Sequence, residues 1–322
     1  MDQPALRSVE KRLPSQSNET FDVLIAGLRG QTDRRLAELF PRPPEPTGGL
    51  RAAIAHGLLS PGKRLRPLIT LLACRQCGGD VAEALDAACA VEMVHAASLI
   101  IDDLPCMDDA RMRRNGLATH VAYGEGVGIL AAIALLNEAF HTLSRMDRVD
   151  PHRRNVAAEK LSAAIGVNGL AGGQERDLAR DGGAPTGGLD EIHKSHLEKT
   201  GALFAAAAGM GAVIAGARAV EIEAMERFGA ALGLAYQTFD DVIDAECDVT
   251  QTGKDSGKDE NRTTVVTLMG ARKANVSAGD WIARAVESAE KVDCGAGAPL
   301  VDLARAVEAK FNALTAKMKK NA

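Results

Sequence analysis

Two clusters of aspartates, each placed directly after an apolar stretch, constrain this chain more than any other feature. The first is SLIIDDLPCMDD at residues 98–109, and the second is FDDVID at residues 239–244. Carboxylates this close repel one another and are costly to bury unless cations compensate them. Mg²⁺ suits such clusters, because it binds few carboxylates and completes its octahedron with water and phosphate oxygens.

The spacing within each cluster indicates how the carboxylates meet. Pro105 cannot continue a helix, so the first helix should end just after Asp103, and the following loop can return Asp108 beside Asp102. In the second cluster, helical spacing places Asp240 and Asp244 on one face. A solvated acidic helix end would explain one such pair, but two clusters after apolar helices favour a metal site.

Cations accompany both clusters. Lys63 and Arg66 are three residues apart and can face one anion together, and an arginine-rich segment, DARMRRNG, follows the first cluster at residues 109–116. Lys199 and Thr200 stand at the mouth of an Ala- and Gly-rich helix, where a buried lysine requires a partner. The segment TGKDSGKD at 252–259 lacks Walker A spacing and suits a loop that supplies lysines to a phosphate.

Composition limits the alternatives. The 322 residues carry a net charge of −5, which argues against nucleic acid as a partner. Six scattered cysteines and a polar N-terminus favour reduced thiols and a cytoplasmic location. The longest apolar run, Gly201 to Ala217, is slightly short for a membrane span, so we expect a buried helix and no transmembrane segment.

Apolar periodicity predicts an all-α chain without strands, built as one domain of helices around a central cavity. Residues 1–17 are expected to be a mobile segment and 18–322 the domain. The expected helices are Glu19–Phe40, Leu50–Leu58, Leu68–Cys77, Val81–Asp103, Tyr123–Met146, Val156–Leu178, Leu189–Ala215, Ala219–Asp244 and three shorter ones between Thr263 and Lys319.

Together these motifs resemble the trans-prenyltransferases, or polyprenyl synthases. The resemblance runs from about Leu50 to Leu268, and it rests on GKRLRP at 62–67, DDLPCMD at 102–108, Lys199-Thr200, and Gln237 before DDVID at 240–244. Residues 93–109 are especially similar to the bacterial geranylgeranyl diphosphate synthases of carotenoid pathways. The resemblance implies the isoprenoid-synthase helical bundle, a homodimer and three Mg²⁺ ions.

The resemblance also implies a role for each motif residue. Asp102 and Asp108 would bind two ions and Asp240 the third, and Asp103, Asp241 and Asp244 complete the acidic motifs. The allylic diphosphate would be held by Arg113, Lys199, Lys254 and Lys258, with Gln174 and Asp177 beside the metals. Isopentenyl diphosphate would be held by Lys63, Arg66, His95 and Arg114, and Thr200 and Gln237 would line the reacting carbons.

The implied reaction is head-to-tail condensation of isopentenyl diphosphate with dimethylallyl, geranyl or farnesyl diphosphate. Small residues such as Ala97 before the first cluster favour a twenty-carbon product, with farnesyl diphosphate synthase as the alternative. A class I terpene cyclase would not need a second diphosphate site, and a non-catalytic synthase subunit would be expected to lose metal ligands. Two departures from the family pattern are Asn115-Gly116-Leu117 and Arg262.

Overall fold

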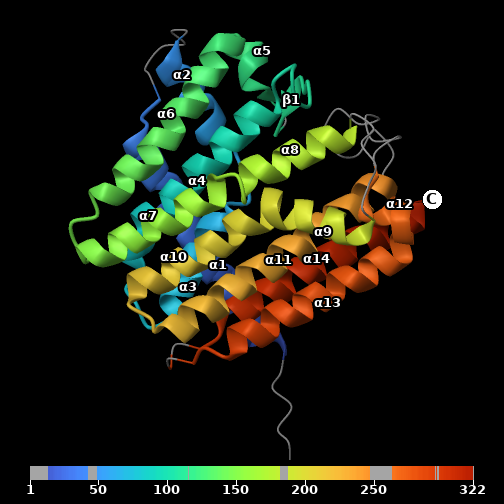
Figure 1. The fold of residues 1–322 in the computed structure, drawn as a ribbon. Helices are drawn as coiled ribbons and strands as arrows, with labels where there is room; N and C mark the ends of the chain where they lie inside the picture. The colour runs from blue at the N-terminus through green and yellow to red at the C-terminus, as the bar shows by residue number, and fades with distance from the viewer. Residues whose placement is uncertain are drawn as a thin grey trace, which may run out of the picture.

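The computed structural model describes residues 14–42, 49–114, 116–181, 188–246, 263–293, 295 and 297–321. Helices α4 (Val81–Asp102), α10 (Ala202–Ala215) and α11 (Ala219–Glu246) build its centre, and α6 (Glu125–Ser144) lies on the outer side of α4 (Figure 1). Helix α4 packs against α6 and α3 (Leu65–Gln76), while α10 packs against α3, α7 (Pro151–Ile165) and α11. The all-α class predicted from the sequence is confirmed.

The remaining elements cover this centre and connect it. They are α1 (Pro14–Leu39), α2 (Leu50–Leu58), α5 (Thr119–Tyr123), α8 (Leu170–Asp181), α9 (Leu189–His196), the π-helical turn η1 (Leu197–Gly201), α12 (Val265–Met269), α13 (Ala271–Glu290) and α14 (Pro299–Asn321). Helices α13 and α14 pack along α11 and close the side shown in red and orange (Figure 1). The C-terminal third therefore forms three helices, as predicted.

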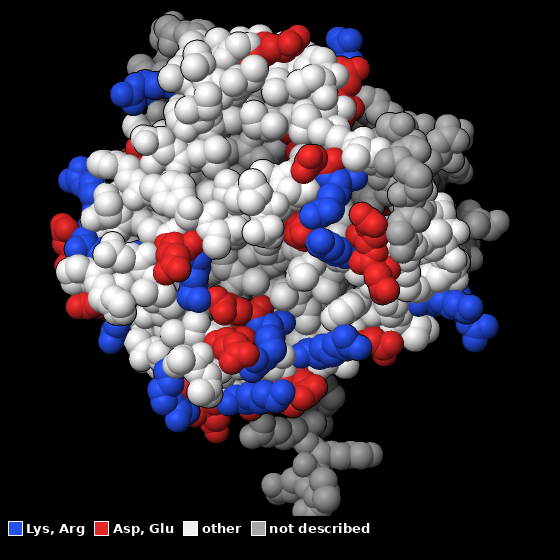
Figure 2. Space-filling model, in the orientation of Figure 1, with Lys and Arg blue, Asp and Glu red and all other residues white. Residues whose placement is uncertain are grey.

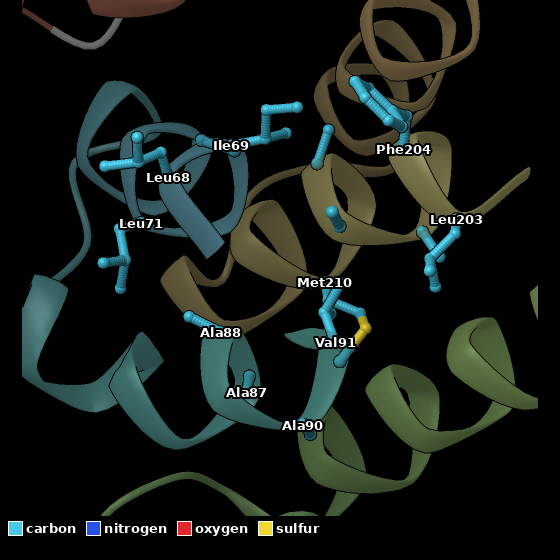
Figure 3. Close-up of a cluster of buried hydrophobic side chains, with 14 of the residues drawn as sticks. Leu68, Ile69, Leu71, Ala87, Ala88, Ala90, Val91, Leu203, Phe204 and Met210 are labelled. Atoms are coloured by element: carbon cyan, nitrogen blue, oxygen red, sulfur yellow. The ribbon is translucent and has the colours of Figure 1, made fainter. Parts of the chain in front are cut away.

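Small residues let the central helices approach closely. Buried alanines of α4 (Ala87, Ala88 and Ala90) lie in one apolar cluster with Leu and Ile side chains of α3 (Figure 3). A Cβ atom at Gly211 would lie 2.2 Å from the carbonyl oxygen of Thr70, so α10 and α3 meet backbone to backbone there. The Ala- and Gly-rich run is thus a buried core helix, because its small residues leave space that a neighbouring helix fills.

Several predicted boundaries were wrong. The first helix begins at Pro14, so residues 14–17 are helical, and residues 1–13 lie outside the described residues. The expected helix from Tyr123 is interrupted at Gly124, whose φ of 87° is incompatible with a helix. The expected run 156–178 is two helices, α7 and α8, separated by a turn that includes Gly166 and Gly169.

A short hairpin corrects the prediction that the chain has no strands. Strands β1 (Met112–Arg113) and β2 (Gly116–Leu117) pair antiparallel just after the first aspartate cluster. Each strand has two residues, too few for any alternation of apolar and polar side chains to show in the sequence. The hairpin matters because it carries Arg113 and leads directly into Arg114.

Within the described part of the chain, three helical stretches are long and apolar enough to cross a membrane by length and composition. These are α4, α6 and the continuous stretch Leu189–Ala215. Their apolar windows are 67%, 39% and 78% buried inside the fold, respectively. Burial in the core therefore accounts for α4 and Leu189–Ala215, and α6 is the stretch that leaves most apolar surface exposed. The absence of a membrane span stays a prediction.

Candidate active site

The end of α4 folds back on itself and brings the first aspartates together. Helix α4 ends at Asp102, and the backbone N–H of Asp108 donates to the Asp102 carbonyl at 2.8 Å. The N–H of Ala110 donates to the Asp103 carbonyl at 3.1 Å. The predicted return of Asp108 to a place beside Asp102 is therefore confirmed for the backbone.

The three carboxylates of this turn differ in their surroundings. Asp103 is buried and accepts hydrogen bonds from Nε of Arg113, at 2.8 Å, and from its Nη2. Burial, opposed by Lys199 and assisted by the neighbouring carboxylate of Asp108, raises the pKa of Asp102 to about 6. Asp103 thus orients Arg113, whereas Asp102 is a carboxylate that a nearby cation would stabilise.

The second cluster is tied to η1 by a chain of hydrogen bonds. Thr200 Oγ1 donates to Gln237 Oε1 at 3.0 Å, and Gln237 Nε2 donates to Asp241 Oδ1 at 3.3 Å. Asp241 Oδ2 accepts from the backbone N–H of Val265 at 3.3 Å and lies 3.7 Å from Nε2 of His196. Burial raises the pKa of Asp241 to about 7. The sequence had suggested Thr200, Gln237 and Asp241 separately, and the fold connects them.

Helix α8 and η1 are held together by two parallel ion pairs. Lys199 Nζ lies 2.5 Å from Asp177 Oδ2, and Arg176 Nε lies 2.6 Å from Glu198 Oε2. Burial disfavours the Lys199 ammonium, but Asp177 and Asp102 outweigh this effect and raise its pKa. Lys199 therefore stays charged between a carboxylate of α8 and the carboxylates at the end of α4.

A pocket of cations lies at the start of α3. Nη1 of Arg66 is 3.2 Å from Nε2 of His95, and Nη1 of Arg114 is 3.2 Å from Oγ of Ser60. Burial lowers the pKa of Arg66 to about 10. Burial also lowers the pKa of His95, and the surrounding cations, Arg66 and Arg114 among them, lower it further. Such crowding of positive groups is stabilised by an anion, as a diphosphate would be.

Arg64 fixes the shape of this cation pocket. Its φ of 49° places it in the left-handed region at the start of α3, where its buried guanidinium lies 2.6 Å from Glu92 and 2.8 Å from Asp33. The chain turns at this left-handed residue, which lies between Lys63 and Arg66 in the sequence. Analysis of the sequence missed Arg64 as a structural cation, although it lies within the basic motif.

Electrostatic effects connect the cation pocket with the second cluster, and Lys199 with the first. Asp240 raises the pKa of Lys63 and that of Arg66, although burial acts more strongly on both groups in the opposite direction. Asp102 and Asp108 act in the same way on Lys199. Asp240 is thus near the cation pocket, and the first cluster is near Lys199. The Thr200–Gln237–Asp241 hydrogen bonds connect the residue after Lys199 with the residue after Asp240.

These residues fit Mg²⁺ as far as their donor atoms are concerned. Asp102, Asp108 and Asp240 offer hard carboxylate oxygens, and the raised pKa of Asp102 marks a carboxylate that lacks full compensation. Among the described residues, no three His, Cys, Asp or Glu side chains meet closely enough to hold an ion by themselves. An ion bound here would need further oxygens, which a diphosphate provides.

Some sequence-predicted residues remain untested. Lys254 and Lys258, and also Arg262 and Asn115, lie outside the described residues. Gln174 is buried on α8, one turn before Asp177 and Leu178. Residues that the sequence did not single out are Arg176 and Glu198, whose pairing is visible only once α8 and η1 are side by side. Two surface hollows, of about 380 and 300 Å³, lie elsewhere, on α7, α10 and α11 and on α13 and α14.

An all-α bundle with two aspartate clusters and a separate cation pocket defines a prenyltransferase that acts on diphosphates. Residues 49–294 match the family model described as polyprenyl synthetase, and the chain belongs to this family. It is 44% identical to the geranylgeranyl diphosphate synthase of Pantoea ananas over 247 residues, which cover 76% of this chain and 80% of that one.

Two further relatives agree with this assignment. Geranylgeranyl pyrophosphate synthase 12, chloroplastic, of Arabidopsis thaliana is 40% identical over 275 residues, 84% of this chain and 76% of that one. A solved geranyltransferase of Helicobacter pylori, complexed with magnesium and isoprenyl diphosphate, superposes with a TM-score of 0.75 at 27% identity, over 96% of this chain and all of that one. The resemblance seen in the sequence is confirmed.

Proposed function

We propose that this prenyltransferase condenses isopentenyl diphosphate with an allylic diphosphate, head to tail, and releases geranylgeranyl diphosphate. The observation that carries the proposal is that the Lys199-Thr200 turn is bonded both to Asp177 and, through Gln237, to Asp241 of the second aspartate cluster, while a second group of cations gathers around His95 at the start of α3. Two diphosphate sites suit a reaction that joins the carbon chains of two diphosphate esters. Relatives that are 40–44% identical and carry the geranylgeranyl name support the twenty-carbon product.

The residues divide the chemistry between the two pockets. Lys199 and Arg113 would stabilise the charge that develops on the allylic diphosphate when its C–O bond breaks. Bound to Asp102, Asp108 and Asp240, Mg²⁺ would neutralise the same leaving group as a Lewis acid. Lys63, Arg66, His95 and Arg114 would hold isopentenyl diphosphate so that its alkene attacks the allylic carbon; the proton then lost goes to the departing diphosphate.

The alternatives explain less of the structure. A class I terpene cyclase needs one diphosphate site, so the half-buried cations around His95 would have no purpose in it. A non-catalytic subunit would not be expected to keep both aspartate clusters. Farnesyl diphosphate synthase is less favoured, because the residue before the first cluster at position 97 is a small, buried alanine, where a bulky side chain would be expected to limit the product to fifteen carbons.

Three finer points belong to the same proposal. We infer three Mg²⁺ ions in the substrate complex, two on the first cluster and one on the second. We infer a homodimer, because α6 exposes Ile129, Leu130 and Ile133 on one face, and Figure 2 shows little charge over this region. A cytoplasmic location also remains a prediction.

A product assay tests the proposal. Purified protein is incubated with isopentenyl diphosphate and each allylic primer, with and without Mg²⁺, and the products are separated by chain length. We expect a twenty-carbon product that requires Mg²⁺, and a shorter one from Ala97→Phe, because Ala97 is 1% exposed and a bulky ring there would block the growing chain. A product distribution unchanged by Ala97→Phe would refute this account of chain length.

A further inference from the structure

Aromatic side chains are rare in this chain, yet they concentrate beside the cation pocket. The sequence has seven Phe, two Tyr and one Trp residues. Four of these rings form one cluster in the structure. The ring centre of Tyr236 lies 5.9 Å from that of Phe204 and 5.5 Å from that of Phe311. The ring of Phe311 stacks on that of Phe239, with 4.5 Å between the ring centres. Phe311 comes from α14, far away in the sequence, so the cluster joins the C-terminal helix to the site.

This aromatic cluster contacts the two cations that the basic motif supplies. Nζ of Lys63 donates a hydrogen bond of 3.0 Å to the hydroxyl of Tyr236, and it lies 5.3 Å from the Tyr236 ring centre and 5.9 Å from that of Phe311. The guanidinium of Arg66 lies 4.7 Å from the ring centre of Phe204. All three distances to ring centres are within the range of cation–π attraction.

The contacts restrict Lys63 in particular. A lysine side chain has many rotamers, and fixing it before a ligand arrives lowers the entropy cost of binding. Burial disfavours the Lys63 ammonium, but Tyr236 and Asp240 outweigh burial and raise its pKa. Lys63 is therefore held charged and directed by one hydroxyl and two rings.

We propose that Tyr236 and Phe311 are positioning residues that hold the Lys63 ammonium for the diphosphate of isopentenyl diphosphate. The proposal rests on the proposed function, in which Lys63 belongs to the second diphosphate pocket. Tyr236 acts through its hydroxyl, and Phe311 acts through its ring. Helix α14 thereby contributes to substrate affinity, although it carries none of the aspartates or cations of the site.

The chain offers a matched pair of variants, because it has two tyrosines. Tyr236→Phe removes the hydroxyl that Lys63 contacts and keeps the ring. Tyr123→Phe removes the hydroxyl of the second tyrosine, which lies on α5. The ring of Tyr123 is edge-on to that of His56, with 5.4 Å between the ring centres. We expect Tyr236→Phe to raise the KM for isopentenyl diphosphate about fivefold, the factor that one hydrogen bond of ordinary net strength provides. The KM for the allylic substrate and kcat should change less than about twofold, and the unfolding temperature should not change.

A second background separates positioning from a general structural role. In a Lys63→Met protein, adding Tyr236→Phe should cause no further rise in KM, because the hydroxyl acts through Lys63. Phe311→Leu keeps an apolar side chain but removes the ring, and it should raise the same KM less than Tyr236→Phe does. Equal effects of Tyr236→Phe in both backgrounds, or equal KM increases for both substrates, would overturn the proposal.

Direct binding distinguishes failure of this inference from failure of the proposed function. Calorimetric titration of the full chain with isopentenyl diphosphate should show weaker binding by Tyr236→Phe than by Tyr123→Phe. If the unmodified protein makes no prenyl product but the titration shows this difference, the proposed function is wrong and the positioning role stands. If it makes product and both variants bind isopentenyl diphosphate alike, the positioning role is wrong.

Discussion

Asp102 and Asp241 are carboxyl groups whose pKa values are far above the ordinary 3.8, at about 6 and about 7, because they are buried. A carboxyl group with a raised pKa binds more protons in the folded than in the unfolded protein. Without metal, each group therefore destabilises the fold as the pH rises from about 4 towards its folded pKa. Buried carboxylates of this kind suit a site that is completed by cations.

Asp241→Asn tests this reasoning at the residue scale. In the presence of a chelator, the variant should unfold at a higher temperature than the unmodified protein at about pH 8, where Asp241 is charged, and at a similar temperature at about pH 5. The expected gain at pH 8 is on the order of 1–3 kcal/mol, because burying a charge without full compensation is costly. Thermal unfolding at the two pH values measures the difference, and a variant equally destabilised at both would contradict it.

The individual aspartates, lysines and arginines could be predicted from the sequence because their motifs are local. The return of Asp108 to Asp102 followed from Pro105 alone. The partner of Lys199 was not predicted, because Asp177 is 22 residues away, on α8. The Lys63–Tyr236 contact was not predicted, since it joins residues 173 positions apart.

At the element scale, the contact between α8 and η1 determines where Lys199 lies. A Cβ atom at Gly173 would be 2.2 Å from the backbone nitrogen of Lys199, so only glycine allows this approach. The Arg176–Glu198 and Lys199–Asp177 pairs cross the same interface. The π-helical turn shifts residues 197–201 relative to α9, as single turns of this kind often do at functional sites.

Gly173→Ala should displace η1 and separate Lys199 from Asp177. We expect kcat to fall at least tenfold and the free energy of unfolding to fall by about 1–3 kcal/mol, the usual cost of overpacking. Gly27→Ala is the matched control, because a Cβ atom at Gly27 of α1 meets nothing within 4 Å. That control should retain activity and gain about 0.5–1 kcal/mol from the alanine. Full activity of Gly173→Ala would show that the close approach is not required.

Helix positions were predictable from apolar periodicity, but some of their ends were not. The sequence placed α2 correctly, whereas a single predicted helix became α7 and α8. Glycines at 166 and 169 are compatible with either a weak helix or a turn, and tertiary packing decided between them. The π-helical form of residues 197–201 has no sequence signal of its own and depends on the neighbouring α8.

At the scale of the whole molecule, α6 exposes three large apolar side chains within five positions. Ile129, Leu130 and Ile133 are 41%, 54% and 57% exposed. A second copy of the chain would bury this face in the proposed homodimer, and a charge in its centre would be desolvated without a partner. The homodimer is thus testable by one substitution on α6.

Leu130→Glu should convert the dimer into a monomer in light scattering coupled to size-exclusion chromatography. The control Val276→Glu changes a residue of α13 that is 61% exposed and should leave the dimer intact. The helix itself should persist, because glutamate is a good helix former. A monomeric unmodified protein, or a Leu130→Glu protein that remains dimeric, would contradict the proposed interface.

The central claim is that both aspartate clusters act on one allylic diphosphate through bound Mg²⁺. The most direct test is the turnover of Asp102→Ala and Asp240→Ala at saturating Mg²⁺, compared with Asp280→Ala, which changes an exposed aspartate of α13. Because charge on the leaving group would go unstabilised, we expect each of the first two to lose several orders of magnitude in kcat while Asp280→Ala keeps normal turnover. Near-normal turnover of either cluster variant would contradict the account.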